Sequence, residues 1–218
     1  MYQAVMFDLD GTLTNTLKDI ADSMERVLYR FGLPGHTEEE YRFMVGNGAR
    51  TLARRAVGDS AELEEQVLEA YMSEYGQHKL DTTRPYPGIP ELLRALTDSG
   101  LRLCVLSNKP HRDAVGVVNS FFPDVRFAAV QGQIPGIPAK PDPTGAKQIA
   151  AKLGIAPQDF LYLGDSYVDM ECALKAGMTP VGVLWGFREK EELLTAGAKH
   201  LISKPMELMS LVNRDSRL

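Results

Sequence analysis

Apolar runs and amphipathic stretches divide the chain into elements. Residues 2–7 (YQAVMF) form an apolar run that stops at Asp8 and soon meets Gly11, which predicts a buried strand leading into a loop. Over residues 17–31 the apolar positions recur at helical spacing and end at Gly32, so we expect a helix there. The chain therefore opens with a strand and turns at once to helix.

Helical patterns continue as far as residue 80 without any strand pattern. Thr37 and Glu40 form a capping box, which predicts the start of a second helix. Two more helices are expected over 49–57 and 61–79. A purely helical block thus follows the first strand.

Strand and helix patterns alternate after the turn-rich linker at 82–88 (TTRPYPG). This alternation implies a parallel sheet with helices on both faces, a three-layer α/β fold. Because one strand precedes the helical block and the others follow it, we expect the block to be an insertion. The expected strands are 101–107, 125–130, 160–164, 179–185 and 200–203, and the expected helices are 89–98, 110–121, 143–153, 167–176, 189–196 and 205–213.

Composition narrows the class of protein. Apolar residues make up 44% of the 218 residues, and the net charge is −5, which disfavours a general nucleic-acid binder. The two cysteines, Cys104 and Cys172, exclude a disulfide-rich scaffold, and we expect both to be buried thiols. No run is long enough to span a membrane and no signal peptide is evident, so we expect a cytoplasmic protein, monomeric or homodimeric.

Polar side chains follow several of the expected strands. In open α/β sheets, ligands bind beyond the carboxyl ends of the strands, where these residues would converge. Clustered carboxylates repel one another unless a cation neutralises them, and oxygen ligands of this kind suit Mg²⁺, whereas no His or Cys set has zinc spacing. The residues concerned are Asp8, Leu9, Asp10, Ser107, Asn108, Lys140, Asp165 and Asp169.

These residue types suit phosphoryl transfer. An ionised Asp8 could attack phosphorus, and Asp10 could protonate the leaving oxygen and later activate water. Lys140 and the metal would neutralise charge, while Ser107, Asn108 and the backbone N–H groups near Leu9 would hold the phosphoryl oxygens.

Four motifs in order resemble those of the haloacid dehalogenase superfamily: DLDGTL at 8–13, LSNK at 106–109, AKPDP at 139–143 and GDSYVD at 164–169. The helical insertion resembles the cap of the phosphoglycolate phosphatase-like branch, and the resemblance covers essentially the whole chain. It implies a Rossmann-like catalytic core over 1–14 and 83–218, with an inserted α-helical cap domain over 15–82.

The resemblance also implies roles for single residues. Asp8 would be the nucleophile that forms an aspartyl-phosphate, and Asp10 the general acid/base, with its backbone carbonyl as a Mg²⁺ ligand. Ser107 would bind the phosphoryl group, and Lys140 would stabilise Asp8 and the transferring group. Asp165 would bind Mg²⁺ directly. Asp169 would bind the metal through water or orient Lys140, and its alternative role is that of a first-turn helix acid.

The function that the resemblance implies is a Mg²⁺-dependent phosphatase acting on a small phosphorylated metabolite, with 2-phosphoglycolate as the best guess. One alternative is a β-phosphoglucomutase-like phosphotransferase, and others are phosphatases for pyrophosphate, sugar phosphates or nucleotides. A non-enzymatic binding module is disfavoured, because Asp8, Asp10 and Lys140 are all present.

The loop Gly46-Asn47-Gly48 with Arg50 has two interpretations. It could be a plain turn between helices, or a substrate-specificity loop whose N–H groups and Arg50 bind a second anion. A similar loop in phosphoglycolate phosphatase-like enzymes favours the second interpretation.

Three further points concern residues near the expected site. Lys109 is expected to be a surface cation, and residues 185–188 (WGFR) to provide core packing and a turn, although a similar segment in relatives lies near the rim of the active site. The chain has Asn15 and Thr16 where relatives commonly have an acid and a serine, which affects the expected hinge of the cap rather than the phosphoryl chemistry.

Overall fold

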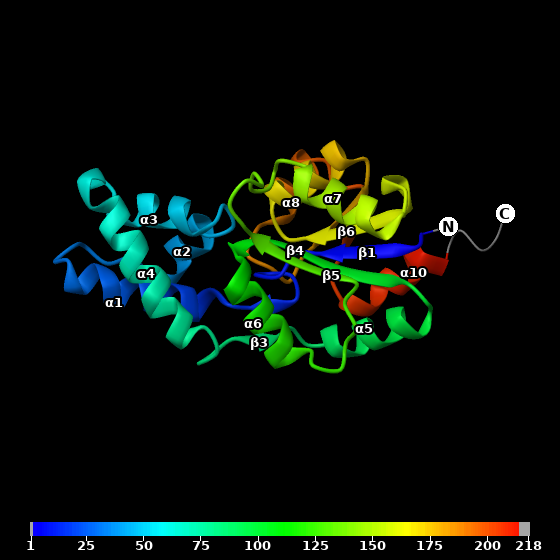
Figure 1. The fold of residues 1–218 in the computed structure, drawn as a ribbon, viewed down its shortest axis with the longest axis horizontal. Helices are drawn as coiled ribbons and strands as arrows, with labels where there is room; N and C mark the ends of the chain where they lie inside the picture. The colour runs from blue at the N-terminus through cyan, green and yellow to red at the C-terminus, as the bar shows by residue number, and fades with distance from the viewer. Residues whose placement is uncertain (1, 214–218) are drawn as a thin grey trace.

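Six parallel strands form the main sheet, in the order β5-β4-β1-β6-β7-β8 (Figure 1). The computed structural model describes residues 2–213. The first strand of the chain lies between β4 and β6, and all four of its residues are buried. The parallel α/β sheet predicted from the sequence is confirmed. The strands are β1 (Ala4–Phe7), β4 (Arg102–Pro110), β5 (Ala129–Gln133), β6 (Phe160–Gly164), β7 (Thr179–Val183) and β8 (His200–Ile202).

Helices cover both faces of this sheet, so the core has three layers (Figure 1). Val5 and Phe7 of β1 pack in one hydrophobic cluster with α5, α6 and α10, while Ala4 and Met6 pack in another with α7 and α8. This split follows from the two-residue period of a strand. The helices are α5 (Ile89–Asp98), α6 (His111–Phe121), α7 (Thr144–Leu153), α8 (Tyr167–Ala176), α9 (Lys190–Thr195) and α10 (Leu208–Asn213).

Four further helices pack on one another beyond the carboxyl ends of the strands, at the left of Figure 1. They are α1 (Leu17–Arg30), α2 (Glu38–Met44), α3 (Ala49–Val57) and α4 (Glu64–His78), and we call this group the cap helices. They have their own hydrophobic cluster, which Phe187 of the core joins. The predicted capping box of Thr37 and Glu40 is present at α2. The domain division at residues 15 and 82 stays a prediction.

The chain crosses between the core and the cap helices twice, and the two crossings pair with each other. β2 (Thr14–Asn15) and β3 (Arg84–Pro85) form a two-stranded antiparallel sheet. The carboxylate of Asp19 in α1 accepts hydrogen bonds from the backbone N–H and the hydroxyl of both Thr82 and Thr83. The segment expected as a linker is therefore fastened to the start of α1.

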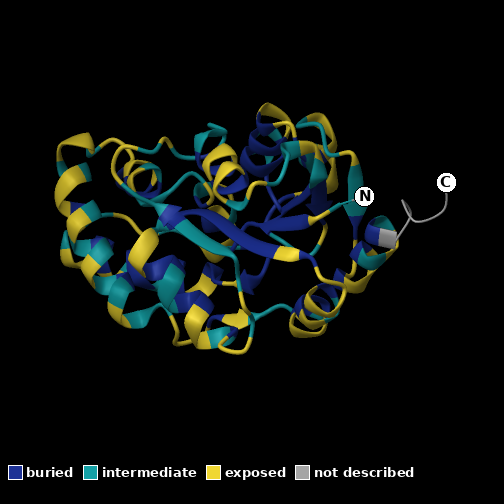
Figure 2. Ribbon diagram, turned by 45° about the vertical axis from the view of Figure 1, so that its right-hand side comes forward, coloured by how far each residue is buried: buried dark blue, intermediate teal, exposed yellow. Residues whose placement is uncertain are grey.

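Three strand predictions were wrong at their ends. The strand expected over 101–107 runs from Arg102 to Pro110. The strand expected over 125–130 runs from Ala129 to Gln133, because Val125 and Phe127 instead form turn hydrogen bonds near the end of α6. The strand expected over 179–185 ends at Val183, and Trp185 donates a side-chain hydrogen bond of 3.0 Å to the carbonyl of Thr12. β1, β4, β6 and β7 are mostly buried, β5 and β8 are mostly half-buried, and outer helix faces are exposed (Figure 2).

Candidate active site

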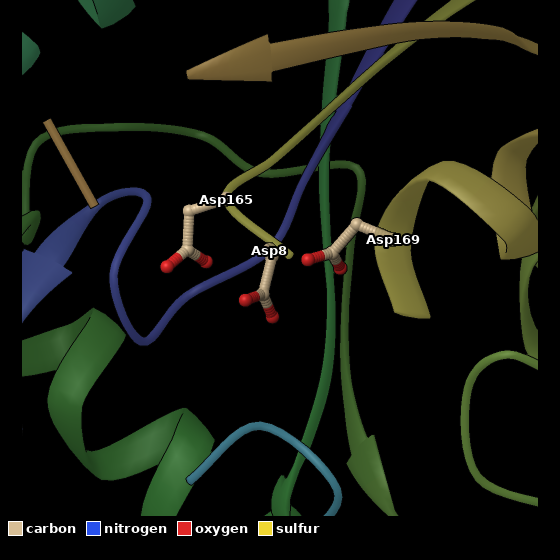
Figure 3. Close-up of side chains that lie close together, drawn as sticks. All are labelled: Asp8, Asp165 and Asp169. Atoms are coloured by element: carbon tan, nitrogen blue, oxygen red, sulfur yellow. The ribbon is translucent and has the colours of Figure 1, made fainter. Parts of the chain in front are cut away.

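Three aspartates lie together at the carboxyl ends of the strands, and their side chains converge (Figure 3). Asp8 follows β1, Asp165 follows β6, and Asp169 lies in the first turn of α8. One carboxylate oxygen from each lies within 4.8 Å of the others, and all three side chains are buried. The sheet topology thus brings together acids that are far apart in the sequence.

Lys140 is the cation placed among these acids. Its Nζ lies 2.7 Å from Oδ1 of Asp8, 2.7 Å from Oδ1 of Asp169 and 3.1 Å from the carbonyl of Leu106. Asn108 holds the lysine in place, because its side-chain amide bonds to both the N–H and the carbonyl of Lys140. Ion pairs buried this deeply are weakly screened by solvent.

Ser107 and Asn108 lie at the carboxyl end of β4, beside the aspartates. The Oγ of Ser107 accepts a hydrogen bond from the N–H of Lys109, which leaves its own proton to donate. Asn108 also donates to the carbonyl of Gly46 at 3.0 Å, so its observed partners are all backbone groups. Asn108 therefore fixes the lysine loop and a cap loop, and its predicted contact with phosphate stays a prediction.

The carboxylates outnumber the positive charge available to them. Burial raises the pKa of Asp8 well above its ordinary value, the Lys140 charge opposes this rise, and the charges of Asp169 and Asp165 add to it. Burial and then the Asp169 charge raise the pKa of Asp165 to about 7. Burial lowers the pKa of Lys140, but the charges of Asp169 and Asp8 outweigh this and raise it. A further cation at this point would stabilise all three acids in their ionised forms.

The aspartate group fits a hard divalent cation such as Mg²⁺, which binds a few carboxylates and keeps positions for water and phosphate oxygens. Asp165 is held firmly for this purpose, since Oδ2 accepts a hydrogen bond of 2.7 Å from the N–H of Phe187. Gly11 and Gly186 border it so closely that a Cβ at either position would collide with the Asp165 carboxylate. These glycines are therefore required by the packing of the acid.

Asp10 lies apart from the three-aspartate group and pairs with a lysine instead. Nζ of Lys109 lies 2.9 Å from Oδ2 of Asp10 and donates a hydrogen bond of 2.7 Å to the hydroxyl of Tyr75 in α4. The expectation that Lys109 is a surface cation was wrong, because its side chain is only 3% exposed. The other oxygen of Asp10, Oδ1, is buried and has no hydrogen-bond partner among the described residues.

A cavity of about 50 Å³ lies between these polar residues and the cap helices. Asp8, Asp10 and Ser107 line it from the core, and apolar side chains including Ile20 and Leu52 line it from the cap helices. A water molecule occupies at least about 10–15 Å³ on this measure, so the cavity has room for on the order of four waters. It suits a small ligand whose polar end meets the aspartates.

The loop at residues 46–50 only partly matches its expected role. Gly46 and Gly48 line the cavity, whereas Asn47 donates a hydrogen bond of 2.8 Å to the Tyr167 hydroxyl. Arg50 is not brought to the cavity: its side chain is 57% exposed and lies 2.7 Å from a carboxylate oxygen of Glu65. It borders a wider groove of about 860 Å³ outside the cavity. The role of Arg50 in binding a second anion therefore stays a prediction that its position does not support.

The sequence reasoning gave Arg188 no role of its own. Residues 185–188 were expected to provide core packing and a turn, with the rim of the active site as the alternative, and Arg188 lines the cavity and is only 8% exposed. One signal was available, because residues 184–188 follow the carboxyl end of β7, at the same edge of the sheet as the aspartates. Among the described residues, no helix is long and apolar enough to cross a membrane.

Comparison with known proteins agrees with this geometry. The sequence profile of a family described as "Haloacid dehalogenase-like hydrolase" matches residues 5–183. A protein of Mannheimia succiniciproducens named phosphoglycolate phosphatase is 35% identical over 197 residues, covering 85% of this chain and 87% of that protein. A protein of Pseudomonas aeruginosa named N-acetylmuramic acid 6-phosphate phosphatase is 32% identical over 216 residues, covering 97% and 95%.

Solved structures give the same picture. The crystal structure of a predicted phosphoglycolate phosphatase from Haemophilus somnus superposes with a TM-score of 0.89 and 28% identity, covering 97% of this chain and 98% of that one. The crystal structure of a predicted phosphatase from Clostridium acetobutylicum gives a TM-score of 0.88 and 27% identity, with 97% and 98% covered.

Proposed function

The chain belongs to the haloacid dehalogenase-like hydrolase family and is a phosphatase, and on this premise we propose that it hydrolyses 2-phosphoglycolate with Mg²⁺ through an aspartyl-phosphate. The observation that carries the proposal is the group of Asp8, Asp165, Asp169 and Lys140 beside a small cavity.

In the first step an oxygen of Asp8 attacks phosphorus, forming an O–P bond while the bond to the substrate's ester oxygen breaks. Asp10 gives its proton to that leaving oxygen. In the second step Asp10 takes a proton from water, the water oxygen attacks phosphorus, and the bond to Asp8 breaks, which releases phosphate. Lys140 balances the negative charge on Asp8 throughout.

Asp8 and Asp165 would hold Mg²⁺, which when bound supplies positive charge against the phosphoryl oxygens. Asp169 has a second task, because Oδ1 binds Lys140 and Oδ2 accepts hydrogen bonds from Ser166. It therefore orients the lysine as well as contributing charge. Asp10 would contact the metal through its backbone carbonyl, since the Asp10 carboxylate pairs with Lys109.

The names of two relatives at 35% identity, both phosphoglycolate phosphatase, support a small substrate. A two-carbon phosphate ester such as 2-phosphoglycolate is far smaller than the sugar phosphate in the name of the Pseudomonas aeruginosa relative. The phosphate end of 2-phosphoglycolate would meet Asp8 and Ser107 in the cavity, which adjoins the wider groove along Gly48 and Asn108.

The test is phosphate release from 2-phosphoglycolate, pyrophosphate, β-glucose 1-phosphate, other sugar phosphates and nucleotides, each with Mg²⁺ and with EDTA. We expect the highest kcat/KM on 2-phosphoglycolate and loss of activity in EDTA. Formation of glucose 6-phosphate from β-glucose 1-phosphate, without phosphate release from any substrate, would overturn the proposal. The cytoplasmic location, the lack of nucleic-acid partners and the monomeric or homodimeric state stay predictions.

A further inference from the structure

Arg188 is a buried cation at the wall of the active-site cavity that the proposed reaction does not use. It follows Phe187, whose N–H holds Asp165, so it is anchored to the catalytic edge of the sheet. It lines the same cavity as Asp8 and Ser107. A guanidinium in such a place is costly to bury unless hydrogen-bond acceptors surround it.

Its hydrogen bonds leave one nitrogen free. Nη2 donates to the carbonyls of Phe43 at 3.2 Å and Val45 at 2.9 Å, both at the end of α2, and Nε lies 3.5 Å from a carboxylate oxygen of Glu192. Nη1 is buried and has no acceptor among the described residues. The side chain thus spans from the core to the cap helices with one donor group unsatisfied.

The other cation that lines the cavity is already engaged. Nζ of Lys109 is paired with Asp10, bonded to the Tyr75 hydroxyl and lies 4.4 Å from the centre of the Tyr75 ring. Within the part of the chain that the structure describes, Lys109 and Arg188 are the only cations lining this cavity. Arg188 is therefore the group available to a second anion on the ligand, beside the phosphate.

We propose that Arg188 is the specificity-determining residue that binds the carboxylate of the substrate, so that the enzyme selects small phosphorylated carboxylic acids. The inference rests on the proposed function and extends it from the phosphate to the rest of the substrate. A carboxylate matches the planar guanidinium and supplies the acceptor that Nη1 lacks. The carbonyls of Phe43 and Val45 fix Nη2 of Arg188. The substrate carboxylate would therefore bind while the cap helices keep their present position against the core.

The test compares 2-phosphoglycolate with 2-phosphoglycolamide, which has nearly the same shape but no carboxylate charge. For Arg188→Gln we expect kcat/KM on 2-phosphoglycolate to fall by about 100-fold, and on the amide by less than about threefold. Arg188→Lys should restore part of the preference for the acid. If both substrates lose kcat/KM equally, Arg188 only joins the core to the cap helices, and the proposal is overturned.

A binding measurement separates this inference from the reaction itself. In an Asp8→Asn background, titration calorimetry with Mg²⁺ should show 2-phosphoglycolate binding more tightly than the amide, and Arg188→Gln should remove that difference. If no substrate in the panel releases phosphate but this difference appears, the proposed reaction fails while the role of Arg188 stands. If the Asp8→Asn protein that keeps Arg188 binds 2-phosphoglycolate and the amide equally, the inference about Arg188 is overturned, while the proposed reaction is not. Arg54→Gln is the matched control, since Arg54 is an exposed arginine paired with Glu64.

Discussion

Charge balance at single residues governs this site. Lys140 contacts two of the three clustered aspartates directly, while Asp165 accepts a hydrogen bond from a backbone N–H. Asp8 and Asp165 both have raised pKa values, primarily because burial disfavours their ionised forms. The residues are therefore arranged for a state with more positive charge than the protein itself provides.

Replacing the nucleophile should remove turnover without unfolding the protein. Asp8→Asn keeps the size of the side chain but replaces the nucleophilic carboxylate with an amide. We therefore expect kcat to fall by about 10⁴-fold or more. Circular dichroism and thermal melting should stay close to wild type. Substantial steady-state phosphate release by this variant would exclude Asp8 as the nucleophile.

Arg50 distinguishes the structure from the sequence-based hypothesis. Its exposed ion pairs with Glu64 and Glu65 are typical of a solvated surface, so Arg50→Ala should leave kcat/KM on 2-phosphoglycolate within about twofold of wild type. The measurement is steady-state kinetics beside Arg188→Gln. A loss at Arg50 as large as that at Arg188 would return the anion-binding role to the cap loop.

At the level of elements, strand order brings the aspartates to one edge of the sheet, and hydrogen bonds to Asp19 hold the cap helices on the core. Asp19 lies in α1 and is 2% exposed, and it accepts hydrogen bonds of 2.8 Å and 2.9 Å from the N–H groups of Thr82 and Thr83. These bonds hold the segment that returns to the core, at Thr82 and Thr83, against α1. Their loss would leave buried donors without acceptors.

Asp19→Ala should therefore lower the free energy of unfolding by about 3 kcal/mol. The control is Asp22→Ala on the same helix, where the carboxylate forms an exposed ion pair with Lys18, and little change is expected. Urea unfolding followed by circular dichroism measures both variants. Equal midpoints for the two variants would contradict the fastening role of Asp19.

Elements with a local pattern were predictable, and pairings over long sequence distances were not. The β1 run and the helical spacing of α1 depend on neighbouring residues, so their sequence patterns sufficed. β2 and β3 are two residues each, which is too short for a periodicity, and they pair across the whole helical block. A sequence pattern carries no information about such a pairing.

The same reasoning explains why the contacts of Lys109 and Arg188 were not predicted. The burial of Lys109 depends on Asp10 and on Tyr75, which come from different segments of the chain. Arg188 is buried against carbonyls at the end of α2, far from it in sequence. The aspartates and Lys140 were predictable because ordered motifs and strand ends marked them. Lys109 lies in the LSNK motif and Arg188 follows β7, but these signals indicate a place near the site and not the partners that bury the two side chains.

For the molecule as a whole, stability and metal binding are linked through pH. The pKa of Asp165 is raised from 3.8 to about 7, so the unfolded chain releases this proton at lower pH than the folded, metal-free protein. The folded state therefore loses stability as pH rises through this window, and the penalty is complete above about pH 7. A divalent cation that binds the ionised carboxylate offsets the penalty.

Adding Mg²⁺ should accordingly raise Tm more at pH 8 than at pH 6. Scanning calorimetry of the metal-free protein and of the protein with saturating Mg²⁺ measures the two differences. Asp165→Asn is the control, because it removes the titrating ligand and should abolish most of the rise at pH 8. A rise of equal size at both pH values in the wild type would contradict the link to Asp165.

The pairing of β2 with β3 has a consequence for how this protein can change over time. Since the chain leaves the core at Thr14 and returns at Pro85, opposite each other in one antiparallel ladder, both covalent connections of the cap helices lie at one place on the core. The length and sequence of the segment between them can therefore vary without altering strand order or the spacing of the three aspartates. Substrate range can then change through this segment while the bond-breaking chemistry is kept, but a new substrate also requires a matching residue at position 188 of the core, because Arg188 contacts the end of α2.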